Sequence, residues 1–139
     1  MKGYLLDTNI FLRLLTEDDL QQTPAVKQLF TKIIERKIQA YATVAVVLEL
    51  VWTLESYYEL ERSEITSKLT LLLNTPNLVL ENEDVIEDAI ESYEATKADF
   101  ADCYNASFAK LHGEGTVLSY DRHFDKLAGV KRTEPGSLL

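Results

Sequence analysis

The sequence has one cysteine and no apolar run long enough to cross a membrane. The longest such run, residues 44–54, contains Glu49 and falls short of the about 20 residues that a membrane-spanning helix needs. Asp7 interrupts the apolar start of the chain before the core of a signal peptide is complete. The lone Cys103 excludes an internal disulfide framework and suits a reducing compartment, so we expect a small buried side chain there. We therefore expect a cytoplasmic protein with no membrane partner.

Positive charge is scarce as well. The chain has 14 Lys and Arg against 23 Asp and Glu, for a formal net charge of −9 at pH 7. This balance argues against binding of polyanions over the whole surface. A group of acids that holds a metal ion would itself contribute several of these charges, so a nucleic-acid partner is not excluded. Any contact with RNA then depends on a local basic patch and on a divalent metal.

The pattern of apolar residues predicts alternating strands and helices along the whole chain. With 139 residues, of which 46% are apolar, we expect one domain over residues 1–139 with a substantial core. Alternation of this kind predicts an α/β fold with a central, mostly parallel five-stranded sheet and helices on both faces. The expected strands are residues 4–6, 38–42, 78–80, 116–119 and 130–133, and the first is expected to be buried on both faces. Thr43 and Ser63 are the expected N-caps of the two helices that follow the second strand.

Four acids are placed so that they can converge. Asp7 and Asp121 each follow an expected strand directly. Asp102 lies in the first turn of a helix that begins near Asp99, and Glu49 lies within a helix that is apolar nearly all round. A lone buried glutamate is costly unless it is paired, protonated or bound. Because strand carboxyl ends and the helix starts that follow them share one edge of a parallel sheet, we expect these carboxylates to lie together.

Carboxylates packed together repel one another, and a hard dication between them removes that cost. An oxygen-only ligand set, without a cluster of His or Cys, suits Mg²⁺ or Mn²⁺. Such a centre activates water and neutralises charge at a phosphodiester. Ser119 and Asn9 are placed to hydrogen-bond the ligands or the attacking water. The structural alternatives stay open: Asp7 as a turn or capping residue, and Glu49 as half of a buried ion pair.

The segments around these acids resemble the successive motifs of PIN-domain ribonucleases, and in particular of the small, single-domain VapC-type toxins. The likeness covers essentially the whole chain, and four motifs in the right order are far more specific than any one of them. The third motif departs slightly, because Cys103-Tyr104-Asn105 replaces plain aliphatic residues. The four segments are Leu5-Leu6-Asp7-Thr8-Asn9, Val47-Leu48-Glu49-Leu50, Ala98-Asp99-Phe100-Ala101-Asp102 and Ser119-Tyr120-Asp121-Arg122-His123-Phe124.

This resemblance implies a metal-dependent endoribonuclease that acts as the toxin of a type II toxin–antitoxin pair. It implies a homodimer, inhibition by a small VapB-like antitoxin, and usually an RNA target within the translation machinery. Transferred by position, the metal-binding acids are Asp7, Glu49, Asp102 and Asp121, with Asp99 as an auxiliary acid. We expect Asp99 to cap its helix with its side chain and Asp102 to serve the metal. Candidates for phosphate contacts, each equally readable as a solvated surface charge, are Arg13, Lys97, Lys110, Arg122 and Lys126.

Other functions fit the same residues less well. A phosphoryl-transfer enzyme with Asp7 as nucleophile needs a second acid nearby, which Thr8 and Asn9 do not supply. For a ribonuclease built on two histidines, His112 and His123 are poorly placed, and we expect both to face solvent or to offset a helix dipole. A PIN-fold RNA-processing nuclease without an antitoxin, and a non-catalytic binding module, remain as alternatives.

Overall fold

The computed structural model describes residues 2–139, and the chain forms two compact units that divide after Glu83. Strands and helices alternate as the sequence predicts. Within residues 2–139 there are six α-helices, five strands and two short 3-10 helices, and every strand pair is parallel. In that part of the chain no helix has the length and apolar character that a bilayer crossing demands.

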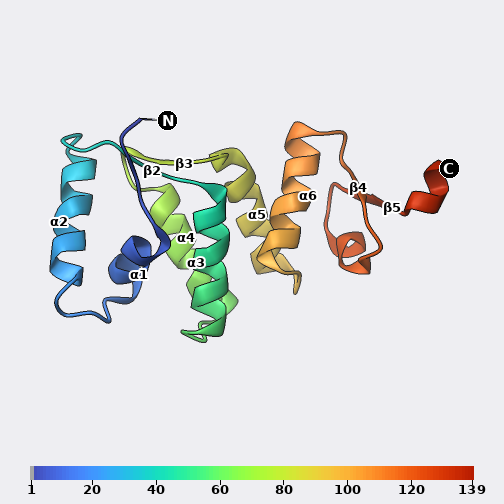
Figure 1. The fold of residues 1–139 in the computed structure, drawn as a ribbon. Coiled ribbons are helices and arrows are strands. Elements are labelled where there is room, and N and C mark those ends of the chain that lie inside the picture. Colours follow the sequence, from blue (N-terminus) through green and yellow to red (C-terminus); the bar gives the residue numbers. More distant parts are fainter. Residues whose placement is uncertain (1) are drawn as a thin grey trace. The chain divides into compact units, whose positions relative to one another are not determined.

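The amino-terminal unit is a three-stranded parallel sheet covered by helices. Its strands β1 (Tyr4–Leu5), β2 (Ala40–Ala42) and β3 (Leu78–Leu80) lie in the order β1-β2-β3. Right-handed crossovers that add strands in one direction put every connecting helix on the same face. Figure 1 shows the four helices of this unit on one face of its sheet. These helices are α1 (Thr8–Thr16), α2 (Thr23–Ile34), α3 (Val44–Ser56) and α4 (Arg62–Leu73).

Along β2 and β3, buried residues alternate with more exposed ones. Ala40 and Ala42 on β2 are buried, whereas Val79, at the centre of β3, is 47% exposed. The prediction that the first strand is buried on both faces is wrong, because Tyr4 and Leu5 are 70% and 52% exposed. β1 is an edge strand of the three-stranded sheet, and an apolar run does not by itself report burial at an edge.

Two helix starts show how local sequence sets the ends of α3 and α4. The Thr43 hydroxyl accepts from the Val46 N–H, as the sequence predicts for an N-cap. The expected cap at Ser63 is wrong. The N-cap of α4 is Glu61, two residues earlier, and the Glu64 side chain accepts from the Glu61 N–H at 3.3 Å. This reciprocal arrangement is a capping box, which satisfies backbone donors that the first turn leaves free.

The carboxy-terminal unit combines two helices with a two-stranded parallel sheet, β4-β5. Tyr93 and Cys103 are fully buried, which confirms the expectation for the cysteine. The Tyr93 ring meets Phe100 edge to face, with centroids 5.5 Å apart, and this contact joins the two helices. The elements are α5 (Glu83–Ala95), which starts at the unit boundary, α6 (Phe100–His112), β4 (Thr116–Leu118), the 3-10 helix η1 (Arg122–Lys126), β5 (Lys131–Thr133) and the 3-10 helix η2 (Pro135–Leu138).

The prediction of one five-stranded sheet is wrong in its number of sheets. The five strands form one sheet of three and one of two. Alternation of strands with helices predicts that strands run parallel, but it does not specify which strands share a ladder. Consecutive strands pair preferentially, and here that preference operates separately in the two units.

Two adjacent leucines of α4 provide a matched test of the core. Leu72 is 2% exposed and Leu71 is 57% exposed. We expect Leu72→Ala to lower the free energy of unfolding by about 2–5 kcal/mol, because it removes buried methyl groups and leaves a cavity. Leu71→Ala should change it by no more than about 0.5 kcal/mol. Denaturant titration of both variants measures the difference, and equal losses would contradict the burial pattern of α4.

Candidate functional site

Three side chains of the carboxy-terminal unit offer ligand atoms to one point in space. One ligand atom from each of Asp102, Asp121 and His123 lies within 4.8 Å of the other two. Asp102 belongs to the first turn of α6, and His123 lies in η1. Ser119 and Tyr120 separate Asp121 from the end of β4. We call these three residues the acidic cluster.

Local structure holds Asp121 from both sides. Its backbone N–H donates to the Ser119 hydroxyl at 2.9 Å, and its Oδ1 accepts from the His123 N–H at 2.9 Å. The second contact makes Asp121 the N-cap of η1, and the buried ring of Phe124 anchors that turn. Ser119 therefore contacts the backbone of Asp121, the residue that we expected it to support.

Arg132 on β5 ties the two ends of this turn together. Its guanidinium donates to the Ser119 carbonyl at 3.1 Å, to Asp125 at 2.9 Å and to Glu134 at 2.8 Å. These contacts connect the segment before Asp121 with the 3-10 helix after it. Arg132 lies outside the four sequence motifs, so only the tertiary structure identifies its role.

The two aspartates of the acidic cluster differ in their affinity for a proton. Burial raises the pKa of Asp102, and the neighbouring charges of Asp121 and Asp99 raise it further. The hydrogen bond from the His123 backbone N–H, together with the imidazole beside it, lowers the pKa of Asp121. Asp102 therefore takes up a proton before Asp121 as the pH falls. A dication favours the ionised form of both groups, and carboxylate oxygens are donors that suit Mg²⁺ or Mn²⁺.

Asp99 acts on the cluster through its charge and not through a cap. It is the N-cap of α6, as the sequence predicts, with φ −61° and ψ 147°. The expected hydrogen bond from its side chain to the first turn is absent, so that part of the prediction is wrong. The Asp99 carboxylate instead raises the pKa of Asp102.

The other two predicted acids belong to the amino-terminal unit. Asp7 follows Leu6 and is itself the N-cap of α1, without a side-chain cap bond, so Thr8 and Asn9 lie inside the helix and do not cap it.

Glu49 is exposed on α3, and the prediction of a buried glutamate is wrong. α3 buries only one stripe, while Trp52 on it is 66% exposed, and an apolar composition did not reveal that stripe. Participation of Asp7, Glu49 and Asn9 in the site remains a prediction from their motifs.

The cations proposed for RNA contacts have different surroundings. Arg13 pairs with Asp18 and donates to Gln22 at 2.7 Å. Lys110 donates to Asp88 at 2.9 Å. Arg122 and Lys126 are exposed on η1, on either side of His123, and Lys97 is exposed just before α6. The charges of Arg13 and Lys110 are therefore engaged within the protein, and the two cations of η1 are the better candidates.

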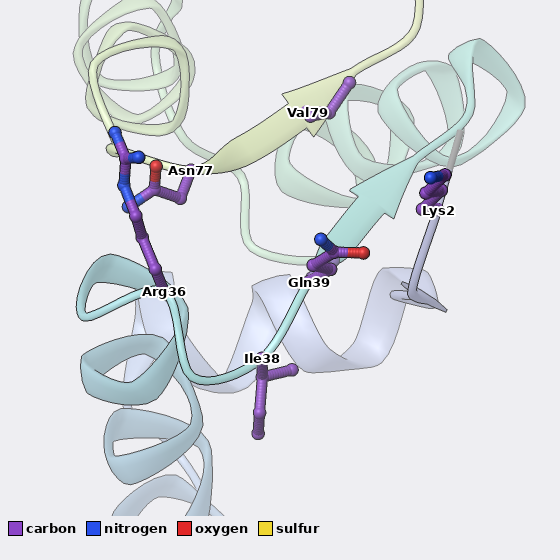
Figure 2. A pocket seen from close by; sticks show the side chains of 7 residues that line it. Lys2, Arg36, Ile38, Gln39, Asn77 and Val79 are labelled. Carbon is purple, nitrogen blue, oxygen red and sulfur yellow. The ribbon is translucent and has the colours of Figure 1, made fainter.

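The surface has a hollow beside the acidic cluster, and the other unit has a hollow of its own. Asp102 and Asp121 border an open hollow of about 530 Å³ between α6, β4 and η1. A hollow of about 340 Å³ lies in the other unit, at the amino ends of its strands, and holds none of the predicted site residues (Figure 2). Arg36, Asn77 and Lys2 are among the residues that line it. Open parallel sheets bind ligands at their carboxyl ends, so we assign this second hollow no part in the site.

Comparison with known proteins identifies the family to which this site belongs. Residues 4–130 match the family model described as PIN domain. The VapC ribonuclease of Aquifex aeolicus (strain VF5) is 30% identical over 131 residues, which cover 94% of this chain and 96% of that protein. The family match includes all four motifs and the acidic cluster. The chain therefore belongs to the PIN-domain family and is of the VapC type.

Proposed function

We propose that this protein is a metal-dependent endoribonuclease that hydrolyses RNA phosphodiester bonds and acts as the toxin of a toxin–antitoxin pair. The observation that carries the proposal is the approach of a carboxylate oxygen of Asp102 and one of Asp121 to within 4.8 Å, in a chain of this family. Like charges are held together at a cost, and a site that binds a dication recovers that cost. The Aquifex relative is a VapC ribonuclease, and this similarity supports RNA as the substrate.

The proposed site combines the acidic cluster with acids taken from the sequence motifs. Asp7, Glu49, Asp102 and Asp121 are the proposed ligands of Mg²⁺ or Mn²⁺, and Asp99 assists by its charge. A bound dication supplies Lewis acidity at the phosphate and lowers the pKa of attacking water. The protein contributes two carboxylates held in place, one by the first turn of α6 and one by the cap of η1. Arg122 and Lys126 offer positive charge to the RNA backbone next to these carboxylates.

The remaining parts of the proposal concern partners. We propose a small VapB-like antitoxin, a homodimer and a cytoplasmic location, each supported by the VapC-type relationship. A net charge of −9 disfavours unspecific attraction to RNA, so productive contact depends on the metal and on the few cations beside it.

Removal of single carboxylates tests the nuclease directly. We expect the purified protein to cleave labelled RNA with Mg²⁺ and to stop when EDTA is added. Asp7→Asn and Asp102→Asn should each lose more activity than the about 10–100-fold typical of residues that only support a metal ligand. Asp84→Asn, a carboxylate of the same unit as Asp102 that pairs with His112, is the control and should cleave at the wild-type rate. Full activity in Asp7→Asn would remove Asp7 from the site.

The raised pKa of Asp102 predicts how metal and pH change stability. Because the folded state holds the Asp102 proton more tightly than the unfolded chain does, stability from this group falls as the pH rises through its folded pKa. Metal-free Asp102→Asn should therefore melt above the wild type at pH 7. The difference should vanish below pH 3.8, the ordinary pKa of the group, where Asp102 is protonated in both states.

Divalent metal should reverse this order. At a hundredfold excess over Kd, Mn²⁺ should stabilise the wild type by about 2.7 kcal/mol, and Asp102→Asn by much less. Melting scans of both proteins with EDTA and with Mn²⁺ measure the effect. An equal shift in the two proteins would show that Asp102 is not a metal ligand.

A further inference from the structure

We propose that His123 is a positioning residue, whose ring holds the Asp121 carboxylate so that a single oxygen, Oδ2, faces the metal. This inference rests on the proposed metal-dependent nuclease and adds a residue to its site. His123 follows the fourth acid by two positions, and composition alone suggested only a solvent-facing ring.

Both contacts from His123 fall on the same oxygen of Asp121. The backbone N–H of His123 donates to Oδ1 at 2.9 Å, and the ring Nδ1 lies 2.7 Å from Oδ1. Neither contact involves Oδ2 of Asp121. The two contacts from His123 therefore fall on one oxygen and do not occupy the lone pairs of the other.

The chemistry of the two groups determines the direction of the ring contact. An ionised carboxylate accepts and does not donate, so the proton lies on Nδ1 of His123. A neutral imidazole with its proton on Nδ1 can also donate this hydrogen bond, so the proposal requires no change of charge. Groups that hydrogen-bond a metal ligand in this way orient it and raise its affinity for the metal.

The setting of His123 makes such control of Asp121 effective. The His123 ring is 66% exposed, so few packing contacts compete with its contact to Asp121. The backbone below it is held firmly, because Phe124 and Leu127 are buried at 5% and 3% exposure. The His123 ring can therefore turn toward Asp121, while the buried side chains of its turn hold the backbone in place.

Asn and Gln substitutions separate a positioning role from simple packing. The side-chain amide nitrogen of Asn lies the same number of bonds from Cβ as Nδ1 of His, whereas that of Gln lies one bond farther. We expect H123N to retain the Mn²⁺ affinity of the wild type, and H123Q and H123A to bind Mn²⁺ about tenfold more weakly. The backbone hydrogen bond to Oδ1 survives in all three variants. Loss of the spectroscopic signal of free Mn²⁺ in a titration of the full chain measures binding without reference to RNA cleavage.

The other histidine of the chain provides a matched control. His112 pairs with Asp84 at 2.9 Å in the same unit and is not a member of the acidic cluster. H112A should bind Mn²⁺ as the wild type does. Melting in EDTA should be the same for the wild type and all His123 variants, which shows that any loss of affinity is not a loss of fold.

Different results overturn different parts of the proposal. Wild-type affinity in H123A would end the positioning role while leaving the metal site intact. Weak binding in H123N as well as H123A, with a changed preference for Mn²⁺ over Mg²⁺ in a competition titration, would make the ring nitrogen a direct ligand. If the wild type itself fails to bind Mn²⁺, the metal site of the proposed function falls, and the role of His123 falls with it.

Discussion

Repulsion between the carboxylates of Asp102 and Asp121 is the constraint around which the carboxy-terminal unit is built. Both groups are charged at neutral pH unless burial or a partner prevents it, and their mutual effect raises the pKa of Asp102. Asp99 increases this repulsion. Hydrogen bonds with Ser119 and His123 nevertheless hold Asp121 beside Asp102. Groups whose pKa values are shifted by burial and by neighbouring charges gather at functional sites, which makes this cluster the candidate site.

The elements that hold the acids are short but firmly anchored. Asp102 sits on a helix whose buried side includes Cys103 and Tyr104, so its position follows from packing. Asp121 sits at the junction of a three-residue strand and a 3-10 helix, where packing alone specifies little. Hydrogen bonds with Ser119 and His123 supply the missing constraint there. One carboxylate is thus placed by the core and the other by a local polar network.

The sequence failed where a prediction depended on burial or on the geometry of one side chain. Glu49 was expected to be buried because its helix is rich in apolar residues, but the helix exposes that side of itself. Asp99 was expected to cap with its carboxylate, and its backbone takes the capping position while the side chain does not bond. Tyr4 and Leu5 were expected to be covered, and both are exposed on an edge strand. In each case the residue type was compatible with more than one arrangement.

The sequence by itself determined the order and type of the elements, the parallel direction of the strands, and the positions of Asp7 and Asp121 shortly after strands. These features depend on periodicity and on chain-local geometry, which a sequence records. Only the tertiary structure decided that Asp102, Asp121 and His123 share one point, that Arg132 fastens the turn beside them, and that the strands divide between two sheets. Some of those features depend on distances between segments that are remote along the chain, and others depend on side-chain rotamers. Neither periodicity nor composition encodes either of these.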